Sequence, residues 1–254
     1  MSTVPESVGT APGQVGTVPD PVSAAPTLFT TVSAPLDSVL ADNLYRFYHV
    51  GDEETRALRG VSLTLRPGEL VAVMGASGSG KSTLLACLAG LDDPDGGHVD
   101  IGGTRITRRP EGERARLRGT RVGVLLQSDN LLPHLSVLDN ALLPMRLAGK
   151  VDRTFALALL GQVGLERRAG HLPGQLSGGE LARAGLVVAL AASPQVLLAD
   201  EPTAEVDADT EQRLFEVLDH FRTRGGAVLI STHSPALAAR ADRVLRLHDG
   251  RLHE

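Results

Sequence analysis

A glycine-rich run that ends in lysine and serine is the strongest chemical signal in the sequence. It comprises Gly75, Ala76, Ser77, Gly78, Ser79, Gly80, Lys81 and Ser82, and Thr83, which follows, is also expected to contact the nucleotide. The residues up to Ser82 fit the pattern G-x-x-x-x-G-K-[ST], in which backbone N–H groups and the start of a helix surround phosphate oxygens. Lys81 adds a full positive charge for the β- and γ-phosphates, and the Ser82 hydroxyl is suited to bind Mg²⁺. We therefore expect a site for ATP or a similar triphosphate with magnesium.

Polar residues also follow two short apolar runs. Residues 196–199 lead into Asp200 and Glu201, and residues 227–230 end near His233. Runs of this length are typical of buried parallel strands, and ligands bind at the carboxyl ends of such strands. We predict that Asp200 binds Mg²⁺ and that Glu201 polarises the attacking water as a general base. A solvated acidic pair at a strand end is the alternative for an isolated signal of this kind.

The surrounding elements predict an α/β fold of the P-loop NTPase type. Residues 70–74 read as a buried strand before the glycine-rich loop, and residues 82–89 read as the helix after it. Residues 43–48 and 61–65 alternate as antiparallel strands do, and residues 244–247 and 251–252 flank an Asp-Gly hairpin signal. We expect a mainly parallel central sheet with an N-terminal antiparallel β layer.

The pattern becomes helical between residues 128 and 176, with an amphipathic run at 155–163 and a candidate capping box from Ser136 to Asp139. We predict that residues 128–176 form a helical subdomain inserted into an ATPase domain of residues 37–254. Residues 1–36 are rich in Pro, Ser, Thr and Ala without periodicity, which predicts a disordered tail. A tethering or regulatory segment is the alternative for this tail.

Composition narrows the class of protein. The 254 residues are 42% hydrophobic and carry a net charge of −5, so a full core is available and nucleic acid is not the expected partner. No apolar stretch approaches the roughly 20 residues that span a bilayer. The single cysteine, Cys87, excludes a disulfide framework and is expected to be a small buried hydrophobe. Seven arginines between positions 105 and 121 interleave with Glu111 and Glu113, which favours a solvated surface over a lipid or nucleic-acid contact.

The run Leu176, Ser177, Gly178, Gly179 and Glu180 resembles the signature L-S-G-G-[QE] of ATP-binding-cassette (ABC) ATPases. The positions that match this family in order are Tyr48, Gly75 to Ser82, Gln127, Ser177 to Gly179, Asp200, Glu201, Asp207 and His233. The resemblance implies that Tyr48 stacks on adenine and that Gln127 binds magnesium and senses the γ-phosphate. It also implies that Glu201, His233, Gln127 and Lys81 are catalytic. Ser177 to Gly179 and Asp207 would then contact ATP held by a second ATPase subunit.

Single matches have simpler interpretations. Tyr48 could cover an apolar edge, Gln127 could be a surface amide, and His233 could be a hydrogen-bonded histidine at a strand end. Departures from the family pattern are Leu181 and Ala182 after the signature, Val188 in place of an arginine, and Glu205 before Asp207. These changes fall on contacts that the resemblance assigns to the dimer interface.

Further stretches, among them residues 48–51, 57–63, 130–133 and 241–244, resemble the lipoprotein-release and macrolide-export branch of the family. The resemblance implies a subunit that powers a membrane transporter from the cytoplasmic face of the cell membrane through an integral-membrane permease. The alternatives are a soluble ABC ATPase acting on ribosomes or DNA and a nucleotide-binding subunit with little turnover. The lack of a duplicated cassette and of heptads argues against the first of these.

Overall fold

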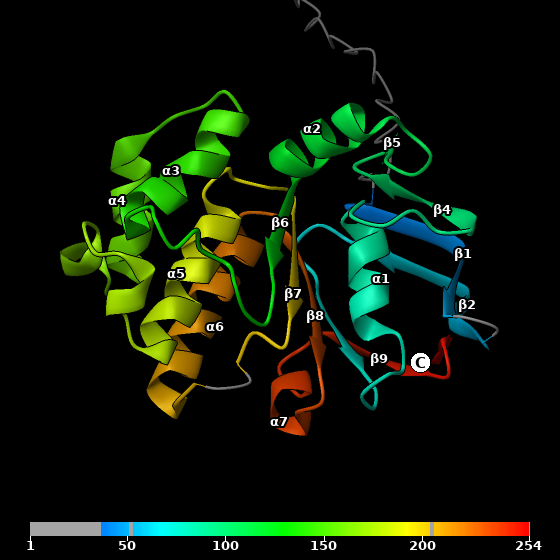
Figure 1. Cartoon of the computed structure of the whole chain (residues 1–254). Coiled ribbons are helices and arrows are strands. Elements are labelled where there is room, and N and C mark those ends of the chain that lie inside the picture. The colour runs from blue at the N-terminus through cyan, green and yellow to red at the C-terminus, as the bar shows by residue number, and fades with distance from the viewer. Residues whose placement is uncertain (1–36, 51–52, 204–205, 254) are drawn as a thin grey trace, which may run out of the picture. The chain divides into compact units, whose positions relative to one another are not determined.

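The computed structural model describes residues 37–50, 53–203 and 206–253. The predicted tail at 1–36 and the unusual Glu205 lie outside the described residues, so those two expectations stay predictions. Figure 1 shows the described elements in order along the chain.

A six-stranded sheet is built in the order β10-β9-β3-β8-β7-β6. Its strands are β3 (Leu70–Met74), β6 (Val122–Leu125), β7 (Val196–Asp200), β8 (Ala227–Thr232), β9 (Arg243–His248) and β10 (Arg251–His253). Its neighbouring strands pair in parallel except for β10, which returns antiparallel to β9. The predicted mainly parallel sheet is confirmed.

A second sheet is antiparallel and follows the order β2-β1-β4-β5. Its strands are β1 (Val39–Val50), β2 (Glu53–Leu65), β4 (Gly96–Ile101) and β5 (Thr104–Arg105). The predicted antiparallel layer is confirmed, although β1 and β2 extend beyond the predicted strands. The helix α1 (Lys81–Leu88) lies between the two sheets (Figure 1). It buries Leu84, Cys87 and Leu88 in the core that joins them.

Most of the remaining helices lie on the other side of the parallel sheet. They are α3 (Val137–Leu147), α4 (Arg153–Gln162), α5 (Gly178–Leu190) and α6 (Ala208–Thr223), with the short η1 (Glu166–Arg168), η2 (Pro173–Gln175) and α7 (Pro235–Ala238). α5 and α6 pack on the sheet, and α3 and α4 pack on α5. Side chains of β3 alternate between two cores: Leu70 and Ala72 face these helices, whereas Val71 and Val73 face α1. This alternation follows from the period of a strand that is buried on both faces.

Four elements between α1 and the helical region were missing from the sequence-based expectation: β4, β5, α2 (Glu111–Arg121) and β6. On α2, arginines pair with acids in the same helix and nearby, as Arg114 does with Asp93 at 2.6 Å and with Glu111 at 2.6 Å. These pairs agree with the predicted solvated surface.

The predicted capping box at the start of α3 was only half right. Ser136 accepts a hydrogen bond from the Asp139 backbone N–H at 3.1 Å. The Asp139 carboxylate accepts from the Ser136 hydroxyl at 2.7 Å, so it leaves the Ser136 backbone N–H uncapped. In the part of the chain that the structure describes, every helix is too short or too polar to cross a bilayer.

Candidate nucleotide site

The carboxyl ends of four neighbouring strands bring the predicted polar groups together. β3 ends at the glycine-rich loop, β8 ends just before His233, β7 ends at Asp200, and β6 ends shortly before Gln127. These strands are adjacent in the order β3-β8-β7-β6. One edge of the sheet therefore presents all of these groups, as expected for a ligand site in an open α/β sheet.

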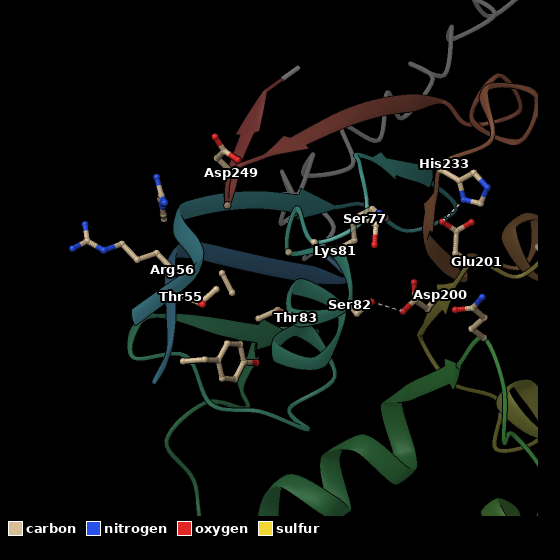
Figure 2. Close-up of a pocket in the computed structure, with 17 residues that line it drawn as sticks. Thr55, Arg56, Ser77, Lys81, Ser82, Thr83, Asp200, Glu201, His233 and Asp249 are labelled. Carbon is tan, nitrogen blue, oxygen red and sulfur yellow. Dashed lines mark hydrogen bonds and ion pairs between the residues drawn. The ribbon is translucent and has the colours of Figure 1, made fainter. Parts of the chain in front are cut away.

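A cavity of about 1010 Å³ lies at this edge. The predicted residues that line it are Tyr48, Ser77, Gly78, Gly80, Lys81, Ser82, Thr83, Gln127, Asp200, Glu201 and His233. Figure 2 shows Ser82 beside Asp200 and Glu201 beside His233 on one wall. The volume is at the upper end of the range of about 300–1,000 Å³ that is common for ligand pockets, so a nucleotide can be accommodated.

Two glycines hold the loop against neighbouring strands. A Cβ at Gly75 would lie 2.3 Å from the carbonyl oxygen of Leu247, and a Cβ at Gly80 would lie 2.4 Å from that of Ala57. Gly80 also has φ of 105° as the N-cap of α1, a conformation that glycine adopts without strain. A side chain at Gly75 would thus clash with β9 and one at Gly80 with β2, whether or not a phosphate is bound.

Lys81 begins α1 and folds back over the loop. Its Nζ donates to the carbonyl oxygens of Gly75 at 2.8 Å and Ala76 at 3.1 Å. No side chain caps α1, so the first backbone N–H groups of the helix are directed at the loop without a side-chain acceptor. The ammonium group of Lys81 and the positive end of the α1 dipole therefore both lie at the loop, where they can bind an anion.

Asp200 is held by two hydroxyl groups. Its Oδ2 accepts a hydrogen bond from the Ser82 hydroxyl at 2.7 Å, and its Oδ1 accepts one from the Ser231 hydroxyl. Oxygen donors of this kind are the ligands that Mg²⁺ prefers, and Gln127 adds an amide oxygen to the same cavity. The donors present therefore fit a magnesium ion that is shared with phosphate oxygens.

Glu201 is paired with the histidine that follows β8. Its Oε1 lies 2.8 Å from His233 Nδ1, and its Oε2 accepts from the Thr232 hydroxyl at 3.2 Å. The Glu201 side chain is 13% exposed, whereas that of His233 is 72% exposed. Glu201 has φ of 46°, a left-handed conformation that costs about 1–3 kcal/mol in a non-glycine residue and recurs at functional sites.

Tyr48 forms a wall of the cavity from β1. Its hydroxyl donates to Asp92 Oδ2 at 2.8 Å. Burial, together with this bond to a carboxylate, raises the pKa of Tyr48. A place in the cavity wall favours stacking on a base over the simple covering of an apolar edge.

Gln127 lies in a loop that is held by the side-chain amide of Asn130. Asn130 accepts from the Leu126 backbone N–H at 2.8 Å and donates to the Leu126 carbonyl oxygen at 2.7 Å. Asn130 also packs on α5, because a Cβ at Gly185 would lie 2.9 Å from its Cβ. Asn130 was not singled out as a site residue from the sequence, since its role depends on this long-range contact.

The signature residues lie outside the wall of this cavity. Ser177 is the N-cap of α5, and its hydroxyl accepts from the Glu180 backbone N–H at 3.3 Å. The Glu180 carboxylate accepts from the Ser177 backbone N–H at 2.9 Å, which completes a capping box. Ser177 and Gly178 are exposed. Neither they nor Gly179 are among the residues that line the cavity.

Asp207 is likewise separate from the cavity lining. It is the N-cap of α6 and accepts from the Thr210 backbone N–H at 2.7 Å, a bond that lowers the pKa of its carboxyl. Arg183 of α5 donates to the Thr210 hydroxyl at 2.7 Å, so the signature helix and α6 are tied together. Leu181 and Ala182, the departures after the signature, line a neighbouring cavity of about 460 Å³.

The cavity has further lining residues that the sequence did not single out. They are Thr55, Arg56, Ala57, Arg59, Asp249 and Gly250. The β9–β10 turn reaches the site because the Arg59 backbone N–H donates to the Gly250 carbonyl oxygen at 2.7 Å. The Asp-Gly signal predicted this turn but carried no information on what it would touch.

Known proteins share these features. The profile of the ABC transporter family matches residues 58–204. The chain belongs to the ABC transporter family. It is 44% identical, over 84% of its length and 96% of the relative's, to the lipoprotein-releasing system ATP-binding protein LolD of Paramagnetospirillum magneticum. It is 43% identical to the macrolide export ATP-binding/permease protein MacB of Chlorobium luteolum, over 82% of its own length and 32% of that longer protein.

Solved structures of ABC cassettes have the same fold. A dimeric structure of the bacterial ABC transporter cassette MJ0796 superposes with a TM-score of 0.81 at 34% identity, covering 85% of this chain and 97% of that one. A post-hydrolysis state of the same cassette bound to ADP and Pi gives a TM-score of 0.81 at 35% identity, with the same coverage. The predicted family, fold, ATPase activity and likeness to the lipoprotein-release and macrolide-export branch are confirmed.

Proposed function

We propose that this ABC ATPase binds ATP with Mg²⁺ in the cavity at the sheet edge and hydrolyses it to power a membrane transporter. The observation that carries this proposal is the joint placement of Lys81, the Asp200–Ser82 pair and the Glu201–His233 pair around one cavity. Phosphoryl transfer is mainly a matter of positioning and charge stabilisation. These residues supply both.

The phosphates are bound by the glycine-rich loop and the start of α1. Lys81, which now bonds to its own loop, can exchange those carbonyl partners for β- and γ-phosphate oxygens. Ser82, Asp200 and Gln127 would hold Mg²⁺, which when bound neutralises charge on the phosphates. Tyr48 stacks on the base from the opposite part of the wall.

Glu201 acts as the general base toward the attacking water. Its carboxylate is fixed by His233 and by Thr232, so its lone pairs have a defined direction. A positioned base of this kind contributes roughly 10²–10⁴-fold to the rate. His233, which is largely exposed, is free on its outer side to contact the γ-phosphate region of the nucleotide.

The working ATPase is a dimer in which two chains share each nucleotide. Ser177 and Gly178 are exposed at a helix start and Gly179 is half-buried there. None of the three lines the cavity of its own chain. A helix start suits a phosphate, so these residues and Asp207 serve the ATP of a second ATPase subunit. ATP binding then favours the closed dimer, and hydrolysis releases it.

The partner is an integral-membrane permease, and the ATPase works at the cytoplasmic face of the membrane. The likeness to the ATP-binding protein LolD and to the ATP-binding part of MacB supports this assignment. It also favours an export or force-transmitting system over an importer.

The test is co-purification of the Glu201→Gln chain from membranes in the presence of ATP. Glutamine is isosteric and keeps a hydrogen bond to Thr232 or His233, but it cannot act as a base. We expect an ATP-bound dimer to be trapped together with a membrane protein. The matched control is Lys81→Ala, which should lose ATP and be recovered as a monomer. Recovery of the Glu201→Gln chain with ribosomes or DNA alone would refute the transporter assignment.

A further inference from the structure

The side chain of Arg46 packs on the ring of Tyr48. The guanidinium carbon of Arg46 lies 4.6 Å from the centroid of the Tyr48 ring, a distance at which a cation is attracted by the π face. Tyr48 lines the nucleotide cavity, whereas Arg46 is absent from its lining. The guanidinium therefore packs on one face of the ring without lining the cavity, an arrangement compatible with a ligand on the other face.

One carboxylate joins this arginine to the tyrosine. Asp92 Oδ2 accepts from Arg46 Nε at 2.8 Å and from the Tyr48 hydroxyl at 2.8 Å. The Asp92 backbone N–H in turn donates to the carbonyl oxygen of Ala86 in α1, at 3.2 Å. Because α1 begins at the glycine-rich loop, the tyrosine ring is tied to the helix whose other end faces the phosphates.

A second carboxylate fixes the strand that carries the ring. Asp95 accepts from Arg46 Nη1 at 3.2 Å and from the Phe47 backbone N–H at 2.7 Å. The pairing of β1 with β4 reaches only to Tyr45 and Gly96, so Asp95 replaces the missing strand partner of Phe47. The bond from Phe47, with help from Arg46, lowers the pKa of Asp95, which keeps this carboxylate charged at neutral pH.

We propose that Arg46, held by Asp92 and Asp95, is a positioning residue that presents the Tyr48 ring to the base of the nucleotide. The inference rests on the proposed function, since it assigns a role to residues behind the base-stacking ring. Without Arg46 the ring could rotate about its side-chain bonds, and ordering it again on binding would oppose affinity. The guanidinium also draws electron density from the ring, which favours an electron-rich purine on the open face.

The test compares two ligands that share a chain of three phosphates, of which only ATP has a base and sugar: Mg²⁺-ATP and Mg²⁺-tripolyphosphate, each measured by titration calorimetry. Arg46→Ala should weaken ATP binding roughly two- to tenfold, the range for freeing one side chain. Its affinity for tripolyphosphate should stay within about twofold of the wild-type value. A purely structural role would lower both affinities, because loosening α1 would also disturb the phosphate loop.

Conservative variants distinguish the positive charge of Arg46 from the flat shape of its guanidinium. They also allow the proposal to be tested if Arg46→Ala fails to fold. Arg46→Lys retains the ion pair with Asp92 but lacks the flat guanidinium, so an intermediate loss is expected. Tyr48→Phe keeps the ring and loses the bond to Asp92, and it should weaken ATP alone. The matched control is Arg105→Ala, which removes an arginine paired with an aspartate, Asp100, at 3.1 Å in the same sheet but outside the cavity. It should change neither affinity.

A double-mutant cycle decides whether Arg46 acts through the ring. In a Tyr48→Ala background, Arg46→Ala should have no further effect on ATP affinity. A persisting loss in that background, equal losses for ATP and tripolyphosphate, or no loss at all would overturn the inference. If the wild-type chain binds neither ligand, the proposed function itself fails. If it binds both and the Arg46 variants behave like the control, only this inference fails.

Discussion

Replacing Ser231 with alanine tests how the site holds its magnesium-binding carboxylate. Ser231 lies in β8 and is fully buried, and its hydroxyl donates to Asp200 Oδ1. The other oxygen of Asp200 accepts from Ser82 at 2.7 Å. Alanine removes one of these two bonds without adding volume, and because the position is buried, water cannot easily replace the lost donor.

The expected magnitude follows from the kind of bond. A hydrogen bond to a charged group contributes about 1.5–3 kcal/mol, which corresponds to roughly 10–150-fold in an equilibrium constant. Residues that orient a metal ligand typically change metal affinity by about 10–100-fold when removed. We therefore expect Ser231→Ala to raise the Mg²⁺ concentration for half-maximal activity by about 10–100-fold. At saturating Mg²⁺ the turnover rate should recover, because Glu201 and His233 are untouched.

The assay is steady-state ATP hydrolysis over a Mg²⁺ titration at fixed ATP. The control is Thr120→Ala, which removes a hydroxyl from the exposed helix α2, where it donates to the Arg116 carbonyl oxygen at 2.8 Å. That variant should show the wild-type Mg²⁺ dependence. An unchanged Mg²⁺ dependence in Ser231→Ala would refute the role given to Ser231. So would a loss of turnover that Mg²⁺ cannot restore.

Three further predictions concern the scaffold. Buried Asn140 accepts a hydrogen bond from the Leu132 backbone N–H at 2.7 Å and donates to three carbonyl oxygens. Asn140→Ala should therefore lower the free energy of unfolding, measured by urea denaturation, by about 2–4 kcal/mol. A smaller loss would show that solvent replaces these bonds. Burial raises the pKa of Cys87 to about 12. Its thiol should therefore resist alkylation at pH 8 until the chain is unfolded, which mass spectrometry can measure. Rapid labelling of the native chain would contradict this prediction. The hydrogen bond from the Ser177 backbone N–H and, to a smaller extent, that from Arg168 lower the pKa of Glu180 in the folded chain. The Glu180 cap therefore stabilises α5 fully at pH values above the ordinary Glu pKa of about 4.3. This stabilisation is lost as the pH falls through the lower pKa of the folded chain. Hydrogen exchange should report this loss in the native chain and not in Glu180→Gln.

Local signals were sufficient for the parts of the site that one segment builds by itself. The glycine-rich loop, the lysine and serine after it, and the start of α1 are fixed by steric limits on the backbone and by helix geometry over a few residues. Each of these expectations therefore needed no knowledge of strand order.

The elements that were missed lack a clear local pattern. β4 begins with Gly96 and Gly97, and Gly97 is required because a Cβ there would lie 2.3 Å from the backbone oxygens of Asn43 and Asp42. β6 has only four residues and directly follows the charged helix α2. Both strands are stabilised by pairing with distant segments, and such pairing leaves no periodic signal in a short run.

The sequence by itself determined that this chain has a phosphate loop, carboxylates after a buried strand, and the ABC signature, because each depends on residues close together in the chain. Only the tertiary structure decided that Gln127, Asp200, Glu201 and His233 meet that loop, since this depends on the strand order β3-β8-β7-β6. It also decided that Arg46 and Asp92 contact Tyr48 and that Ser231 bonds to Asp200. Strand order is set by burial of whole faces and by crossovers over many residues, and no local run of side chains encodes it.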